Sequence, residues 1–150
     1  MINVKFKRLK AWAVEPSQGT PGAACWDLSA CLPELVDSVM IHPCHRVAIG
    51  TGLAVEIPEG YCMRLYSRSG HGARHGVRLA NCVGVIDSDY RGEIMVVITN
   101  DDIDRGYKLQ AGERIVQACI ERVEPVTFTE VDELAVSQRG AGGFGSTGVV

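Results

Sequence analysis

Apolar side chains recur along this chain in short runs separated by turn signals. Near the N-terminus, Ile2, Val4 and Phe6 alternate with polar residues, as in a half-buried β-strand. The same pattern predicts strands at Arg46–Ile49, Leu53–Ile57, Tyr61–Ser67, Val77–Leu79, Cys82–Ile86, Glu93–Thr99, Ile115–Ile120 and Val126–Val131. No segment keeps a helical period for long, and the polar stretch 68–76 has room for at most a short helical turn. The pattern therefore predicts an all-β sandwich, jelly roll or barrel.

Length and composition indicate one globular domain. The 150 residues are 46% hydrophobic and 22% charged, which is ordinary for a domain with a real core. A net charge of −3 without any basic stripe argues against a general nucleic-acid or membrane-surface binder. No apolar run reaches the length of a membrane span, and the first residues do not form a signal peptide. We therefore expect a soluble, cytoplasmic protein.

The segment Asn81–Gly92 concentrates more candidate chemistry than any other. An apolar run leads into two carboxylates and a tyrosine, and a second predicted strand begins at Glu93. This order predicts a β-hairpin whose far end presents Asp87 and Tyr90. An ordinary turn remains the alternative, because Asp-Ser-Asp is common turn chemistry.

Three shorter stretches carry further candidate groups. Arg68, Ser69 and Gly70 together can hold a phosphate through bidentate contact and a backbone N–H, although a solvated loop has the same composition. Gln117 is a lone amide in an apolar strand, which fits either an edge position or a phosphate donor. Asp27 lies within an apolar run, and a buried carboxylate there needs polar partners or a nearby metal.

The chain ends in the glycine-rich stretch Arg139–Gly148, which holds one basic and one aromatic side chain. Glycine loses the most conformational freedom on ordering, so this stretch is expected to be mobile when nothing is bound. A frayed terminus is one interpretation. The other is a flexible arm that closes over a ligand carrying a flat ring and phosphates.

In chain order, these stretches resemble the motif series of the trimeric deoxyuridine triphosphatases, the dUTPases. The series comprises Ala24–Leu28, Arg68–Gly70, Asn81–Gly92, Gly112–Gln117 and Arg139–Gly148. The resemblance covers nearly the whole chain in matching order and spacing. Its most specific parts are the segment Gly84–Gly92 and the glycine-rich end.

The resemblance implies a jelly-roll-like β-barrel (the dUTPase-like β-clip), at most one short helix and a flexible C-terminal arm. It implies a single domain over residues 1–150, with 133–150 as the mobile arm, and a homotrimer whose active sites are shared between subunits. The implied reaction is Mg²⁺-assisted hydrolysis of dUTP to dUMP and pyrophosphate. That reaction limits uracil incorporation into DNA and supplies dUMP for thymidylate synthesis.

The resemblance also implies roles for individual residues. Asp87 holds and activates the attacking water, and Asp27 acts on Mg²⁺ through a metal-bound water. Tyr90 packs on the deoxyribose. The uracil-reading residues are Asn81 and the main chain from Cys82 to Ile86, including Val83, Gly84 and Val85. The phosphate-binding residues are Arg68, Ser69, Gly70 and Gln117.

The arm acquires roles in the same way. Arg139 is implied to grip the γ-phosphate and Phe144 to stack on uracil, with further phosphate contacts from Gly145, Ser146 and Thr147. Two positions depart from the usual pattern, since Trp26 and His71 stand where other apolar residues are common. They put local packing, not catalysis, in question.

Two alternatives to a dUTPase stay open at this point. A dCTP deaminase shares the implied fold, but it needs a glutamate acid/base in the base pocket where this chain presents Asp87. A non-enzymatic regulatory protein that has kept the fold is the other. It is disfavoured because Asp87, Tyr90 and Arg139 are all present.

Overall fold

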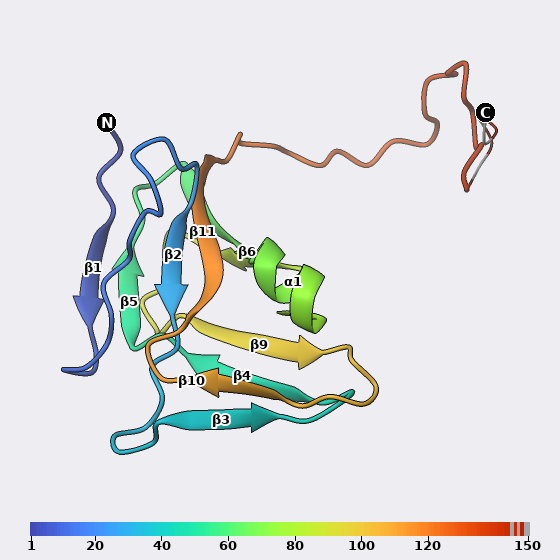
Figure 1. Ribbon diagram of the computed structural model, residues 1–150. Coiled ribbons are helices and arrows are strands. Elements are labelled where there is room, and N and C mark those ends of the chain that lie inside the picture. Colours follow the sequence, from blue (N-terminus) through green and yellow to red (C-terminus); the bar gives the residue numbers. More distant parts are fainter. Residues whose placement is uncertain (145, 147, 149–150) are drawn as a thin grey trace.

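The computed structural model describes residues 1–144, 146 and 148, and in this part of the chain it consists of β-strands with one short helix (Figure 1). The strands are β1 (Lys5–Arg8), β2 (Trp26–Ser29), β3 (Ser38–Ile41), β4 (Arg46–Gly50), β5 (Leu53–Glu56), β6 (Tyr61–Ser67), β7 (Val77–Leu79), β8 (Val83–Ile86), β9 (Met95–Asn100), β10 (Tyr107–Gln110) and β11 (Arg114–Arg122). The helix α1 (Ser69–His75) has seven residues. Among the described residues no helix is long and apolar enough to span a membrane.

The strands pair into antiparallel sheets that enclose one core. The largest sheet has the order β2-β11-β6-β8, a second has the order β4-β9-β7, and β1 pairs with β5 and β10 with β3. The most completely buried apolar side chains come from nearly every sheet: Leu28, Ile41, Leu53, Leu65, Leu79, Ile94, Leu109 and Val116. This arrangement is a jelly-roll-like fold, so the predicted fold class is confirmed.

The predicted hairpin between the strands at 82–86 and 93–99 is wrong. β8 pairs with β6, whereas β9 pairs with β4 and β7 in the other sheet. The chain crosses between the sheets because Glu93 and Ile94 are bound to the turn before β5. The Gly52 N–H donates to the Glu93 carboxylate at 2.8 Å, and the Ile94 N–H donates to the Leu53 carbonyl at 2.8 Å.

The strand predicted at Val126–Val131 is also wrong. After β11 the chain leaves the body of the molecule as an extended, irregular segment (Figure 1). Its apolar side chains are exposed, with Phe128 almost fully so. A β-favouring composition does not make a strand unless another strand offers hydrogen bonds, and the described part of this chain offers none here.

The remaining strand predictions differ from the structure mainly at their ends. The strands at 61–67 and 77–79 match the predicted bounds, and those at 46–49, 53–57, 82–86 and 115–120 differ by one or two residues. The N-terminal strand begins later than the alternation suggested, and its four residues are all exposed. The stretches that became β2, β3 and β10 carried no predicted strand.

Candidate active site

A pocket of about 360 Å³ opens between the strands β7 and β8 on one side and β9 on the other. Leu79, Asn81 and Gly84 line it from the first side, and Met95 and Val97 line it from the second. Its walls are thus mostly apolar, and the polar side chains among them are the Asn81 amide and the Arg46 guanidinium of β4. A pocket of this kind suits a small planar ring with polar edges.

The turn from β7 to β8 places Asn81 at the mouth of this pocket. The Cys82 N–H donates to the Leu79 carbonyl at 3.3 Å, and the Val83 N–H donates to the Asn81 carbonyl at 2.7 Å. Cys82 adopts a left-handed conformation with φ of 63°, which is uncommon for a residue with a side chain. The tight turn leaves the Asn81 side chain exposed.

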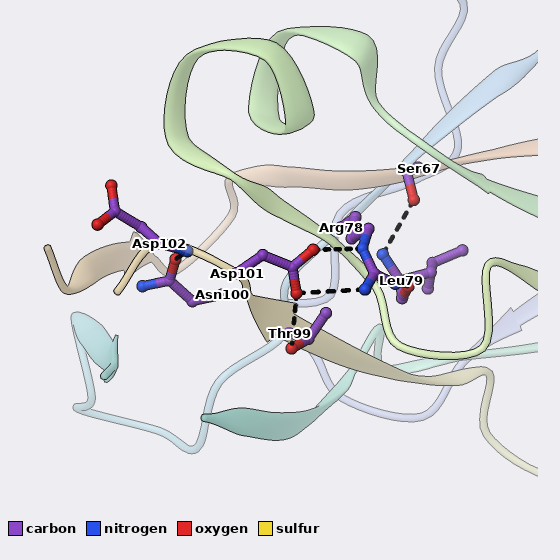
Figure 2. Close-up of polar contacts among 7 residues, drawn as sticks. All are labelled: Ser67, Arg78, Leu79, Thr99, Asn100, Asp101 and Asp102. Carbon is purple, nitrogen blue, oxygen red and sulfur yellow. Dashed lines mark hydrogen bonds and ion pairs between the residues drawn. The ribbon is translucent and has the colours of Figure 1, made fainter. Parts of the chain in front are cut away.

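Polar contacts behind the turn hold β7 in place (Figure 2). The Arg78 guanidinium forms a bidentate contact with the Asp101 carboxylate, at 2.5 and 3.2 Å. The Leu79 N–H donates to the Ser67 hydroxyl at 2.9 Å, which links β7 to the end of β6. These contacts anchor the strand that leads into the Asn81 turn.

Gly84 is required by the approach of β8 to β6. It pairs with Leu65, and a Cβ at Gly84 would lie 3.1 Å from the Leu65 Cβ. β8 is an edge strand of the sheet, so among the described residues only one of its two edges is paired. The other edge leaves backbone N–H and C=O groups available to a ligand.

Asp87 follows β8 directly and is exposed. The chain then turns back, and the Tyr90 N–H donates to the Asp87 carbonyl at 3.2 Å. The Tyr90 hydroxyl donates to the Glu93 carbonyl at 2.9 Å, and the tyrosine ring lies so close over Gly92 that a Cβ there would collide with it. Asp87 and Tyr90 thus belong to one well-defined loop, although it is a crossover between sheets and not a hairpin end.

Asp27 lies in a second group of candidates. Its side chain is buried, and Oδ1 lies 3.2 Å from Nε of Arg68 while Oδ2 lies 3.1 Å from Nη1 of Arg114. Arg68 also donates from Nη1 to the Arg114 carbonyl at 3.1 Å. The buried carboxylate therefore has the polar partners that the sequence required, and they are two arginines.

Gln117 lies beside this group. It is half-buried in β11, opposite Asp27 of β2 and Tyr66 of β6. Ser69 and Gly70 begin α1 directly after Arg68, and both are exposed. The sheet β2-β11-β6 thus brings the predicted phosphate residues together with Asp27.

The Asp27 carboxylate fits the implied outer-sphere contact to Mg²⁺. In the described part of the chain no three His, Cys, Asp or Glu side chains lie close enough together to hold a metal directly. Asp27 Oδ1, however, is buried without a hydrogen bond: it forms an ion pair with Nε of Arg68 at 3.2 Å, but the N–H of that atom does not point at it. Such an oxygen can accept a hydrogen bond from a metal-bound water.

The structure does not bring the C-terminal arm to either group. Arg139 donates from Nε to the Gly142 carbonyl at 2.9 Å, and Phe144 and Ser146 are exposed. The segment after β11 leads away from the strands (Figure 1). Gly145 and Thr147 lie outside the described residues. The pocket lining also contains none of Asp27, Arg68 and Gln117, so one chain presents two separate parts of a site.

Some contributing residues carried no individual prediction. Arg114 stands inside the stretch Gly112–Gln117, and its role follows only from the pairing of β2 with β11. Met95 lines the pocket from β9, which the sequence placed in the hairpin. Of the two departures noted above, Trp26 is 45% exposed, whereas His71 is half-buried and contacts Glu113.

Comparison with known proteins identifies the family. The dUTPase family model matches residues 12–148. A deoxyuridine 5'-triphosphate nucleotidohydrolase from Anaplasma marginale is 44% identical over 151 residues, covering 99% of both chains. The enzyme of the same name from Thermobifida fusca is 43% identical over 147 residues, covering 98% of this chain and 79% of the relative.

Solved structures of dUTPases have the same fold as this chain. The dUTPase of Staphylococcus bacteriophage 80alpha with dUpNHpp has a TM-score of 0.85 at 29% identity, covering 98% of this chain and 99% of the other. A phage phi11 dUTPase, described with a structural Mg(II) ion, shares the fold with a TM-score of 0.77 at 22% identity, covering 87% and 97%. The chain therefore belongs to the dUTPase family and is an enzyme that hydrolyses dUTP.

Proposed function

We propose that this enzyme hydrolyses dUTP by attack of water on the α-phosphorus, releasing dUMP and pyrophosphate. One observation carries the proposal: Asp87 follows directly on β8, a strand that lines the pocket and has one unpaired edge. A base bound along that edge has its sugar and α-phosphate near the Asp87 loop. Asp87 then accepts a hydrogen bond from the attacking water and takes its proton.

Uracil is selected in this proposal by the pocket between β8 and β9. The free edge of β8 at Val83, Gly84 and Val85, together with the Asn81 amide, offers donors and acceptors to the uracil edge. A cytosine amino group in that place leaves polar groups unpaired, which penalises the wrong base strongly. In this proposal the methyl group of thymine is excluded by the apolar wall to which Met95 belongs.

Tyr90 selects the sugar. Its ring is held over Gly92 by the bond from its hydroxyl to the Glu93 carbonyl. A ring fixed in this way packs against the face of a deoxyribose and excludes a 2′-hydroxyl. The proposal therefore assigns the preference for dUTP over UTP to Tyr90.

The phosphates are bound by Arg68, Ser69, Gly70 and Gln117, and we propose that the first three of these residues come from a neighbouring subunit of a homotrimer. The separation of this group from the base pocket within one chain supports that assignment. The extended course of the chain after β11 supports a mobile arm over residues 133–150 that reaches a neighbour's site (Figure 1). There Arg139 grips the γ-phosphate and Phe144 stacks on uracil, with Gly145, Ser146 and Thr147 adding phosphate contacts.

Mg²⁺ enters with the substrate in this proposal. Asp27 would hold the ion indirectly, through a metal-bound water that donates to Oδ1, and the substrate phosphates would hold it directly. An ion held in this way would supply positive charge that offsets the charge of the leaving pyrophosphate. The buried, unbonded Oδ1 is the observation that supports this role for Asp27.

The reaction would limit uracil incorporation into DNA and supply dUMP for thymidylate synthesis, in the cytoplasm of the cell or of a host. A panel of dUTP, dCTP, dTTP and UTP with Mg²⁺ tests the specificity, with pyrophosphate and ammonia measured separately. Pyrophosphate from dUTP alone supports the proposal. Ammonia from dCTP would point instead to a deaminase, and equal turnover of UTP would remove the role of Tyr90.

A further inference from the structure

The first turn of α1 is held against the turn between β10 and β11 by a polar cluster. Nε2 of His71 lies 3.1 Å from Oε1 of Glu113. The Tyr107 hydroxyl donates to the same Oε1, and the Gln110 N–H donates to Oε2 at 3.0 Å. The His71 and Tyr107 rings lie in contact, with centroids 5.6 Å apart. Glu113 thus ties together one residue of the helix and two of β10.

The cluster is shielded from water. Only 12% of the His71 side chain and 22% of the Glu113 side chain are exposed. Burial lowers the pKa of His71, while the Glu113 carboxylate acts in the opposite direction. The imidazole is therefore neutral at pH 7, with its proton on Nε2, where it donates to Glu113. Burial and the bond to Glu113 hold the Tyr107 pKa far above its ordinary value, so the phenol keeps its proton as well.

The segment from Arg68 to His71 is fastened at both ends to consecutive residues of β11 and its turn. At one end Arg68 donates to the Arg114 carbonyl at 3.1 Å and faces Asp27. At the other end His71 contacts Glu113. Ser69 and Gly70 lie between these two attachments and are exposed. They form the first turn of α1, which the N–H groups of His71 and Gly72 close by donating to the Arg68 carbonyl at 3.1 and 3.2 Å.

We propose that His71 is a positioning residue of this enzyme: through Glu113 it holds Ser69 and Gly70 in the arrangement that binds the substrate's phosphates. This inference rests on the proposed phosphate role of the Arg68–Gly70 loop. An apolar side chain of similar volume fills the space beside Tyr107 but donates nothing to Glu113. The first turn of α1 then keeps its backbone bonds and the contacts of Arg68, but it loses its side-chain contact with the turn between β10 and β11.

Charged and titratable groups on every side of His71 make the role depend on pH. Glu113 of the β10–β11 turn attracts an imidazolium, whereas Arg68 and His75 repel it. Tyr107 of β10 contacts the ring and is uncharged. Protonation of His71 in acid therefore replaces a neutral donor by a cation beside Arg68. This changes the contact between His71 and Glu113 that holds Ser69 and Gly70 in position.

The test compares His71→Leu with His71→Gln, which keeps a donor near the position of Nε2. His71→Leu is expected to weaken binding of dUpNHpp about fivefold, the equivalent of one lost hydrogen bond. Binding of deoxyuridine, which lacks phosphates, is expected to be unchanged. The His71→Gln variant is expected to keep most of the native affinity for dUpNHpp. The inference would be overturned if His71→Leu weakened binding of dUpNHpp and deoxyuridine equally. It would also be overturned if a folded His71→Leu variant bound dUpNHpp as tightly as the native enzyme.

His75→Leu is the matched control. His75 lies on the same helix and its ring contacts the same Tyr107 ring, with centroids 5.1 Å apart, but it has no bond to Glu113. Its replacement is expected to leave dUpNHpp binding unchanged. Loss equal to that of His71→Leu would show that ring packing alone matters, which contradicts a role through Glu113.

A double-mutant cycle separates this inference from the proposed function. Glu113→Ala and His71→Leu together should weaken dUpNHpp binding no more than Glu113→Ala alone, because Glu113→Ala already removes the contact that His71→Leu removes. Full additivity would overturn the inference. Ser69→Ala tests the phosphate role itself, because it removes a proposed direct contact. If Ser69→Ala and Gln117→Ala have no effect on dUpNHpp binding, the proposed phosphate role fails, whatever His71→Leu does.

Discussion

Gly84 of β8 lies directly opposite Leu65 of β6, and the two strands come so close that a methyl group at Gly84 would be 3.1 Å from the Leu65 Cβ and 3.3 Å from its Cδ1. Leu65 is 1% exposed and belongs to the core, so it has little freedom to move away. The position of β8, and with it one wall of the base pocket, therefore depends on the missing side chain at Gly84.

Gly84→Ala is expected to destabilise the protein by about 1–3 kcal/mol, the usual cost of overpacking a core. Because the strand must shift toward the pocket, kcat/KM for dUTP should fall as well. Chemical unfolding and steady-state kinetics measure the two effects. Gly72→Ala is the control: it lies in α1 with no atom closer than 4.0 Å to the new methyl, and should gain about 0.5–1 kcal/mol. Equal stability of the two variants would contradict the close contact.

Gly92→Ala is expected to relax the choice between dUTP and UTP. The added methyl collides with the Tyr90 ring and displaces it from the place where it excludes a 2′-hydroxyl. The ratio of kcat/KM for dUTP to that for UTP should fall by about tenfold or more, the scale of a lost shape restriction in a pocket. Discrimination against dTTP, which depends on the pocket wall, should stay unchanged. An unaltered dUTP/UTP ratio would argue against Tyr90 as the sugar gate.

Stability should decline as the pH falls through the titration of His71. Burial lowers the pKa of His71 in the folded state, so the folded protein binds fewer protons than the unfolded chain below the unfolded value of about 6.5. The contribution of His71 is complete above that value and is lost as the pH falls toward its folded pKa. Unfolding free energies at pH 7.5 and 5.5 test this, with His71→Gln as the comparison. If the unfolding free energy of His71→Gln falls between these pH values by as much as that of the native protein, groups other than His71 cause the decline.

The C-terminal arm is expected to close over a triphosphate but not over dUMP. Ordering its backbone costs about 1–2 kcal/mol per residue, while one stack of Phe144 on uracil returns about 1–3 kcal/mol. Contacts to the phosphates must therefore supply the difference. Trypsin cleavage after Arg139, which is exposed in the free chain, should slow with dUpNHpp and Mg²⁺. Equal protection by dUMP would rule out a phosphate-dependent closure.

The alternation of apolar and polar residues was enough to predict the fold class and most of the strands. It could not decide which strands pair. β8 and β9 read as a hairpin, but Glu93 is bound to Gly52, far away in sequence, and this contact carries the chain into the other sheet. Val126–Val131 has strand composition without a partner in the described chain, so composition predicted a strand that pairing does not form.

The candidate site was predictable as a set of motifs but not as a geometry. A buried aspartate at position 27 implied polar partners, yet the two arginines that face it come from β11 and from the end of β6. The contact of His71 with Glu113 and Tyr107 could not be predicted, because nothing in the sequence links the three residues. The turn between β10 and β11 creates that link, and it appears only when the chain is folded.

The most direct test of the central claim is pyrophosphate release from dUTP by the native enzyme and by Asp87→Asn. Asparagine keeps the size of the exposed side chain but cannot take a proton from water. We expect kcat to fall by at least about a hundredfold, the contribution of a general base, with dUpNHpp binding retained. An Asp87→Asn enzyme that releases pyrophosphate at the native rate would contradict the assignment of Asp87 as the group that activates the attacking water.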